Sequence, residues 1–185
     1  RDNIKHTYSR VRFGTKVSRR DALHLALMSS ENRMASALAR HYPGGRSAFI
    51  RAMNNKARQL GMRNSRFYDS TGLSTRNVST ARDLAKLITA AYRQPLIRQF
   101  TQDTNKEMRF STPAYSLMFN NTNPLVKNPD WDVRLSKTGY TDEAGRCLLM
   151  RAKPDRQELA IVLLNSVGKR TPIGDANRIR KWLKS

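Results

Sequence analysis

The sequence predicts an α+β fold, in which a helical part comes first, an antiparallel meander follows and one more helix closes the chain. Three observations lead to this class. Apolar residues recur at helical spacing up to about residue 95, three strand-like segments follow residue 131, and an amphipathic segment ends the chain. The length of 185 residues suits one domain with its own core. We expect a single domain over 1–185, with a helical part at about 15–130 and a sheet part at about 131–185.

A capping pattern places the first two helices. Ser18 and Asp21 precede an apolar stretch at 22–28, which predicts a capped and buried helix. The helix ends at 29–32, and small apolar residues then resume until Pro43. Residues 29–32 therefore form a tight junction between two helices.

Two further helices and a loop follow. Residues from Ser47 to Leu60 carry one apolar stripe, and Gly61 supplies the terminating residue. A second capping pattern at Thr80 predicts a helix that Pro95 bounds. The composition of the segment between these helices, 67–73, indicates an ordered loop.

The pattern changes to strands near residue 131. Residues 101–130 are polar and rich in turn formers, and they predict no particular element. Strands are expected at 132–139, 146–152 and 158–165, and the short loops between them indicate an antiparallel meander. Pro172 suits the first turn of the closing helix.

The chain is strongly basic, with a formal net charge of +21. The excess of Lys and Arg occurs in each third of the chain, so it is not a tail. A field of this size favours anionic partners such as nucleic acid, anionic lipid or an acidic wall polymer. No Lys/Arg block alternates with aromatic residues, and we expect no nucleic-acid partner. A solvated basic surface and a dedicated anion-binding patch both fit the composition.

Several other features exclude classes of protein. No apolar run approaches the roughly 20 residues that span a bilayer, so no transmembrane segment is expected. The first residues lack the apolar stretch of a signal peptide, so the signal of an exported protein would already have been removed. His6, His24 and His41 lack the spacing of metal ligands, so we expect no metal. The single cysteine, Cys147, lies in an apolar strand, which favours a small core residue over a nucleophile.

Two motifs carry the chemistry, Ser30-Glu31-Asn32 and Lys137-Thr138-Gly139. An S-x-N and a K-T-G, together with an S-x-x-K that bears the nucleophile, mark active-site serine acyl transfer. Lysine can present an ammonium to a carboxylate or help to move a proton, and glycine on an edge strand lets a ligand backbone approach. Each motif by itself has an ordinary structural interpretation as a helix cap or a strand end.

The order of these motifs resembles that of a known family. Further segments that carry the resemblance are 53–57, Leu60-Gly61-Met62, Ser70-Thr71-Gly72-Leu73 and 144–148. The chain resembles the low-molecular-mass penicillin-binding proteins, the D-alanyl-D-alanine endopeptidases and carboxypeptidases that trim bacterial peptidoglycan, and the endopeptidase branch most. The resemblance implies part of a serine β-lactamase/DD-peptidase-like fold.

The resemblance also implies roles for individual residues. Ser30 would relay protons, and Asn32 would hydrogen-bond the substrate or the catalytic lysine. Lys137 and Thr138, with Gly139, would bind the terminal region of the substrate. The backbone N–H of Tyr140 would be one donor to the oxyanion, and the other would be the N–H of the nucleophile itself.

The chain departs from the family at the S-x-x-K motif. The only such spacing, Ser166 to Lys169, follows K-T-G, trails a strand and contains a glycine where a helix is needed. We interpret it as a loop, so that the nucleophilic serine and its base lysine are absent. The sequence therefore predicts an N-terminally truncated DD-peptidase domain, inactive by itself, whose missing fragment would leave an unpaired strand edge and exposed core.

The sequence thus gives two functional hypotheses. The first is a serine-type D-Ala-D-Ala endopeptidase/carboxypeptidase that cleaves peptidoglycan cross-links through an acyl-enzyme, in the periplasm and without a cofactor. Its partners would be peptidoglycan peptide stems, β-lactam antibiotics as inhibitors and the missing N-terminal fragment. The alternative is a noncatalytic basic module that binds an anionic polymer. Asp142 and Glu143 are expected in a solvated hairpin loop, and Trp131 and Trp182 as packing residues.

Overall fold

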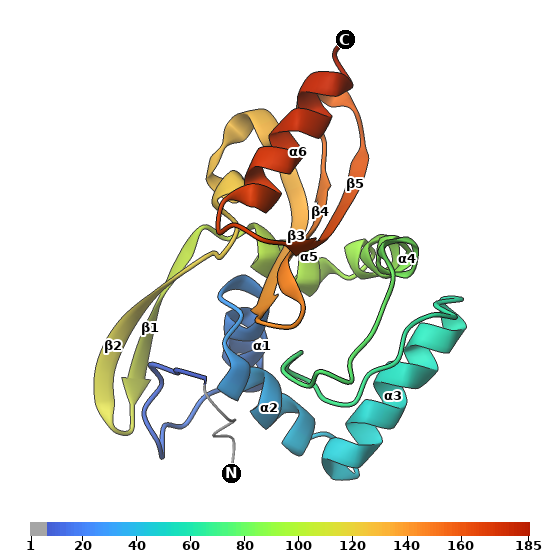
Figure 1. The fold of residues 1–185 in the computed structure, drawn as a ribbon. Helices are drawn as coiled ribbons and strands as arrows, with labels where there is room; N and C mark the ends of the chain where they lie inside the picture. The colour runs from blue at the N-terminus through green and yellow to red at the C-terminus, as the bar shows by residue number, and fades with distance from the viewer. Residues whose placement is uncertain (1–6) are drawn as a thin grey trace.

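The computed structural model describes residues 7–185 and has the expected α+β architecture (Figure 1). The helices come first, then a hairpin, a three-stranded sheet and a last helix. The helices are α1 (Arg19–Met28), α2 (Asn32–Arg40), α3 (Gly45–Gln59), α4 (Ala81–Tyr92), α5 (Pro95–Gln102) and α6 (Thr171–Trp182). The strands are β1 (Asn105–Ser111), β2 (Ala114–Asn120), β3 (Val133–Thr141), β4 (Gly145–Ala152) and β5 (Leu159–Ser166).

The predicted helix caps are confirmed. The Ser18 hydroxyl accepts a hydrogen bond from the Asp21 N–H at 3.0 Å, at the start of α1. At the start of α4 the Thr80 hydroxyl accepts from the Asp83 N–H at 3.2 Å. Each bond satisfies a backbone donor that the first turn leaves without a partner. Pro95 ends the preceding segment as expected, and it also begins a helix, α5, that the sequence analysis did not predict.

The hairpin β1–β2 lies in the segment for which no element was predicted. Its strands pair antiparallel along their whole length, from Asn105 opposite Asn120 to Ser111 opposite Ala114. Only one face is buried, and Met108, Phe110 and Phe119 pack there against α1. Apolar residues alternate along both strands, at Met108 and Phe110 and at Tyr115, Leu117 and Phe119, but the hairpin was not predicted because polar and turn-forming residues dominate the composition of 101–130. Short 3₁₀ turns, η1 (Pro124–Lys127) and η2 (Pro129–Trp131), lead from the hairpin to the sheet.

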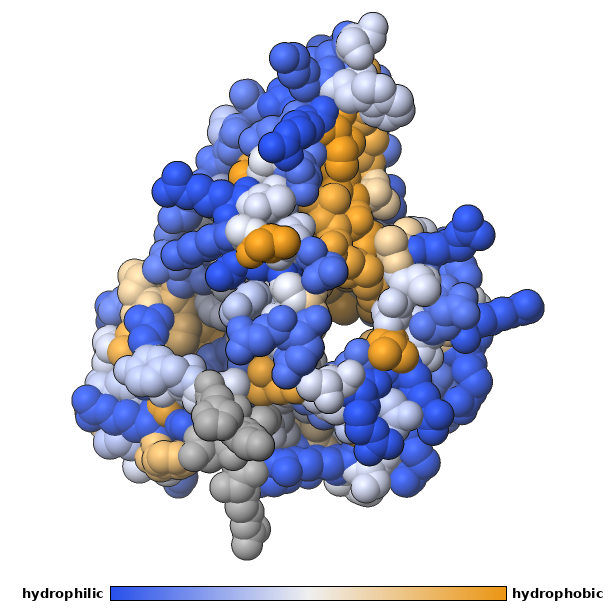
Figure 2. Space-filling view, in the orientation of Figure 1, coloured by the Kyte–Doolittle hydropathy of each residue, from blue (hydrophilic) through white to orange (hydrophobic). Residues whose placement is uncertain are grey.

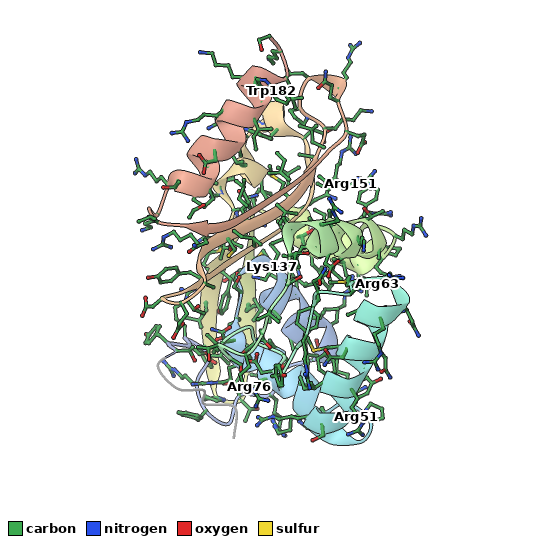
Figure 3. The ribbon with its side chains drawn as sticks, turned by 45° about the vertical axis from the view of Figure 1, so that its right-hand side comes forward. Arg51, Arg63, Arg76, Lys137, Arg151 and Trp182 are labelled. Carbon is green, nitrogen blue, oxygen red and sulfur yellow. The ribbon has the colours of Figure 1, made fainter. Side chains whose placement is uncertain are left out.

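The antiparallel meander is confirmed, in the order β3-β4-β5. Helices cover both faces of this sheet (Figure 3). On one face Leu148 and Met150 of β4 share a core with Ala176 of α6. On the other face Arg151 lies over the ring of Tyr92 from α4, 4.1 Å from its centroid. The sheet thus joins α6 to the helical part.

The two tryptophans differ in burial. Trp131 is fully buried in the core beneath α6, where its indole N–H donates to Asn177 Oδ1 at 3.2 Å. The expectation that Trp182 packs is wrong, because its side chain is 73% exposed. Ile173, Ala176 and Ile179 already form the apolar stripe of α6, and Trp182 lies near the end of the helix, beyond the core residues of the sheet (Figure 3).

This difference predicts unequal effects on stability. Trp131→Ala leaves a large cavity and removes the indole donor of Asn177, and we expect it to lower the free energy of unfolding by about 3–5 kcal/mol. Trp182→Ala removes an exposed ring and should change the same quantity by less than about 0.5 kcal/mol. Urea unfolding followed by circular dichroism measures both. Equal losses in the two variants would contradict this description of the core.

The far edge of the sheet is open, as the sequence analysis expected. Within residues 7–185, β5 pairs only with β4, and Leu164 and the following Val167 are 38% and 96% exposed. An apolar surface runs beside α6 over this part of the sheet (Figure 2). Strand edges and apolar faces of this kind are normally covered in native proteins. Over the same residues, none of the helices combines the length and the apolar character needed to cross a bilayer.

Candidate active site

Ser30 lies at the junction of α1 and α2 with a left-handed backbone, at φ 54°. This conformation lets the N–H groups of Ser29 and Glu31 donate to the same carbonyl, Leu25 O, at 3.0 and 3.2 Å. Glycine adopts this backbone freely, whereas a residue with a Cβ is strained by about 1 kcal/mol. The strained turn directs the Ser30 hydroxyl toward β3, where it donates to Thr138 O at 3.5 Å. Strain of this kind is typical of functional positions.

Lys137 reaches Ser30 from the sheet, although 107 residues separate them. Its ammonium donates to Ser30 Oγ and, at 2.6 Å, to Thr138 O. Burial lowers the pKa of Lys137 to about 8, and no described carboxylate raises it. Figure 3 shows this lysine where the sheet meets the helical part. The contact therefore places a cation without a fixed counter-ion between the two motifs.

The depressed pKa of Lys137 predicts a pH dependence of stability. Unfolding returns the lysine to its ordinary value near 10.5, so between about pH 8 and 10.5 the unfolded chain binds more protons than the native chain. Stability relative to a Lys137→Met variant should therefore rise across this window. Urea unfolding of both proteins at about pH 7.5 and pH 10 measures the difference. A difference between the wild type and Lys137→Met that stays flat across this window would contradict the prediction.

The backbone of β3 presents polar groups to the same place. N–H and C=O of one strand residue point to the same side, and the side alternates along the strand. Because Ser30 and Lys137 both bond Thr138 O, Thr138 faces away from β4, and so does the N–H of Tyr140 two residues on. The Thr138 hydroxyl is bonded to Thr122 at 2.6 Å. Thr122 belongs to no motif, so the sequence analysis did not single it out.

Asn32 is the first residue of α2 and makes no side-chain hydrogen bond within the described chain. Its amide is therefore available to a ligand. The neighbouring Glu31 has the opposite character, since it is buried and its carboxylate accepts from the Met34 N–H at 2.9 Å. Glu31 caps α2, which explains why the middle position of the motif can be acidic and still be buried.

These residues surround a cleft of about 570 Å³ between the helical part and the sheet. One wall is apolar and belongs to α1 and α2, with Leu23, Ala26, Leu27, Ala35 and Leu38. All six residues to which the sequence analysis gave a catalytic or substrate-binding role line the cleft: Ser30, Asn32, Lys137, Thr138, Gly139 and Tyr140. Their roles remain predictions, but the structure brings all of them to one place.

A second cavity of about 510 Å³ adjoins the cleft at β3 and shares Ser30 and Thr138 with it. Three cations line it, Arg146, Lys169 and Arg170, and none forms an ion pair within residues 7–185. They were not predicted, because only the fold brings the loop between β5 and α6 to the same cavity as Arg146 of β4. Lys169 ends the S-x-x-K spacing, and 167–170 form the predicted loop instead of a helix.

The expectation that Cys147 is a core residue is wrong. Cys147 lies opposite Gly139 in the β3–β4 ladder, is partly exposed and lines both cavities. Glycine has no side chain to cover its neighbour, so the thiol stays accessible beside the cleft. The hairpin loop next to it is exposed as predicted, and Asp142 accepts a hydrogen bond from the Tyr140 hydroxyl at 2.7 Å.

The loop predicted at 67–73 forms the third wall of the cleft. Asp69 organises it by accepting hydrogen bonds from the Thr71 N–H at 3.0 Å, the Gly72 N–H at 3.2 Å and the Asn77 side chain. Partial burial raises the pKa of Asp69, but hydrogen bonds from Thr71 and Asn77 outweigh this effect and hold the pKa below its ordinary value. Ser70 ties the loop to α2 through Ala35 O at 3.2 Å.

The two histidines within residues 7–185 lie outside the cleft. His24 is buried, stacks on Phe100 and approaches Asp103 with Nε2 to Oδ2 at 2.9 Å. His41 is exposed at the end of α2, and His6 lies outside the described residues. Over residues 7–185 no three His, Cys, Asp or Glu side chains gather as metal ligands would.

Comparison with known proteins agrees with this geometry. Residues 1–168 match the family described as D-alanyl-D-alanine carboxypeptidase. D-alanyl-D-alanine endopeptidases of Pseudomonas aeruginosa and Escherichia coli are 50% and 51% identical over 98% of this chain. The chain spans 59% of the length of each of these relatives. The crystal structure of the Streptomyces K15 DD-transpeptidase superposes with a TM-score of 0.85 at 27% identity, over 94% of this chain and 70% of that one. The chain belongs to the D-alanyl-D-alanine carboxypeptidase family.

Proposed function

We propose that this chain carries the proton-relay and substrate-binding part of a serine-type DD-peptidase, which cleaves D-Ala-containing cross-links of peptidoglycan through an acyl-enzyme. The observation that carries the proposal is the contact of Lys137 with Ser30, 107 residues away, at the edge of a cleft. A serine beside a lysine of lowered pKa is suited to receive and return a proton during acyl transfer. The names of the relatives support the substrate class.

The remaining roles follow from the chemistry of the site. Tyr140 N–H, on the free side of β3, is placed to donate to the oxyanion of a tetrahedral intermediate. The open edge of β3 lets a peptide add as a strand, with Thr138 and Gly139 as the nearest backbone. The Asn32 amide, which has no described partner, hydrogen-bonds the substrate or the catalytic lysine.

The cations near the cleft indicate which end of the substrate would bind there. Lys137 has no counter-ion in the described chain, and Arg146, Lys169 and Arg170 surround the adjoining cavity without one. Cations left unpaired near a cleft favour an anionic ligand. They suit the free carboxylate that follows a scissile D-Ala bond, and the carboxylate of a β-lactam in the same way.

We further propose that the nucleophile comes from a helical segment outside these 185 residues. The S-x-x-K spacing within the chain lies in a loop, as described above, and the apolar wall of α1 and α2 is suited to pack against such a helix. Residues 1–185 would then form most of a single catalytic domain. We place the complete enzyme in the periplasm, where its polymer lies, with no metal or organic cofactor in the reaction.

Intact mass spectrometry of the protein isolated from its source tests these proposals. We expect a mass above that of the 185 residues, and a covalent adduct after exposure to a labelled penicillin. An adduct on the 185-residue chain by itself would overturn the origin of the nucleophile. A heavier protein that forms no adduct and cleaves no D-Ala-D-Ala peptide would overturn the peptidase function and favour a noncatalytic polymer binder.

A further inference from the structure

A separate cavity of about 600 Å³ lies on the other side of α2, between this helix and residues 11–17. Its floor is apolar, with Val11, Val17 and Met34. Its rim is basic, and none of the lining residues within 7–185 is acidic. We call it the basic pocket, after its five cations Arg12, Lys16, Arg19, Arg33 and Arg40.

Four cations of the basic pocket have no acidic partner in the described chain. Arg12, Lys16, Arg19 and Arg33 form no ion pair within residues 7–185. Aromatic rings fix two of them, since Arg12 lies 4.6 Å from the centroid of Tyr115 and Arg33 lies 4.3 Å from that of Phe13. Guanidinium groups fixed in this way lose less entropy when they bind an anion.

Arg33 adds a second observation that points to a ligand. One arm of its guanidinium donates to Val11 O, but its Nε is buried and has no hydrogen-bond acceptor. A buried donor without a partner destabilises the fold, and a ligand oxygen that reached it would remove this penalty. The cations at the rim would attract the negative charge of that ligand oxygen. The apolar floor would contact the aliphatic carbons that carry it.

We propose that the basic pocket binds a carboxylate-bearing side group of peptidoglycan, on a stem peptide other than the one in the cleft. This inference rests on the proposed function, which makes that polymer the substrate. The pocket has a volume of about 600 Å³, and arginines already lie over the rings of Phe13 and the nearby Tyr115. These features favour a carboxylate side group over a nucleic-acid strand.

A second contact of this kind would act through avidity. A cross-linked wall presents many stems on one polymer, so a group held in the basic pocket raises the local concentration of stems at the cleft. The two sites lie on opposite sides of the α1–α2 pair and share Leu38. The distance between them is therefore fixed by two packed helices.

Co-sedimentation of the 185-residue chain with purified, insoluble peptidoglycan tests the proposal. The pocket variant is Arg12→Gln/Lys16→Gln/Arg19→Gln. The matched control is Arg51→Gln/Arg63→Gln/Arg82→Gln, on exposed residues of α3, α4 and the loop between them, with the same loss of charge. Figure 1 shows α3 on the side of α2 opposite to residues 11–17, and Figure 3 labels Arg51 and Arg63 there. Thermal unfolding establishes that both variants fold.

We expect the pocket variant to bind about 10-fold or more weakly and the control about 3-fold or less, because only the former loses a contact beyond general charge. Amidation of the peptidoglycan carboxylates should abolish this difference. Equal loss in both variants would overturn the proposal, and so would a difference that survives amidation. A larger pocket effect on vesicles of phosphatidylglycerol and phosphatidylethanolamine would overturn it in favour of a lipid phosphate.

Failure of this proposal is distinguishable from failure of the peptidase function. In the complete enzyme the pocket variant should still form a penicillin adduct and cleave a small soluble D-Ala-D-Ala peptide at the wild-type rate, while its cleavage of insoluble peptidoglycan slows. Wild-type rates on both substrates would overturn the basic pocket and leave the peptidase intact. Absence of any adduct in the wild-type enzyme would overturn the peptidase function itself.

Discussion

Replacing Lys137 by alanine is expected to lower the acylation of the complete enzyme by penicillin or a D-Ala-D-Ala peptide by about 100-fold or more. The ammonium has two tasks in the proposed mechanism, since it donates to the Ser30 hydroxyl and faces the cleft as an unpaired cation. Alanine removes both and leaves the Ser30 hydroxyl without its donor. Stopped-flow acylation with a chromogenic β-lactam measures the rate.

Two further variants separate the effect of the Lys137 site from that of general charge. Lys56→Ala removes the same charge from the exposed surface of α3 and should leave acylation unchanged, which isolates the site from the general field of the protein. Lys137→Arg keeps the cation but cannot lose its proton near neutral pH. Retention of the wild-type rate in Lys137→Ala would contradict the assignment of this residue to the site.

Substitutions of Ser30 are expected to separate stability from activity. Both Ser30→Ala and Ser30→Gly remove the hydroxyl that contacts Lys137 and Thr138, and we expect either to reduce acylation by about 10²–10⁴-fold, the range of a lost proton-transfer group. Their stabilities should differ. Glycine relieves the left-handed backbone that alanine retains, so Ser30→Gly should be more stable than Ser30→Ala by about 1 kcal/mol.

The neighbouring serine provides the control for backbone conformation. Ser29 has an ordinary φ of −107°, so the order should reverse there, with Ser29→Ala more stable than Ser29→Gly. Urea unfolding of the four variants measures both differences. If Ser30→Gly is the less stable of its pair, then the junction does not store the strain that its backbone angle indicates.

Much of the fold could be predicted because local signals agreed with tertiary structure. The Ser18 and Thr80 caps are short-range patterns that depend on neighbouring residues only, and both formed as expected. The meander was visible because its strands are apolar and its loops short. The alternating apolar residues of the hairpin β1–β2 were overlooked in a segment of polar composition. The exposure of Trp182 depends on which surfaces meet, and no local pattern carries that information.

The candidate site likewise combines residues that local motifs reveal with residues that only the fold brings together. Its two motifs could be found because each is contiguous, and the structure places them against each other. Arg146 belongs to β4 and Lys169 and Arg170 to the loop before α6, and only the folded chain gathers them around one cavity. Cys147 was assigned to the core because its neighbours are apolar, whereas its exposure results from the glycine opposite.

The contact between Ser30 and Lys137 also determines how late in synthesis the two motifs can meet. A ribosome adds about 5–20 residues per second, so the 107 residues between the two side chains take roughly 5–20 s to appear. Throughout that interval the growing chain contains Ser30 but not its partner Lys137. The pairing of the two motifs is therefore completed only when the last sheet closes onto the first two helices.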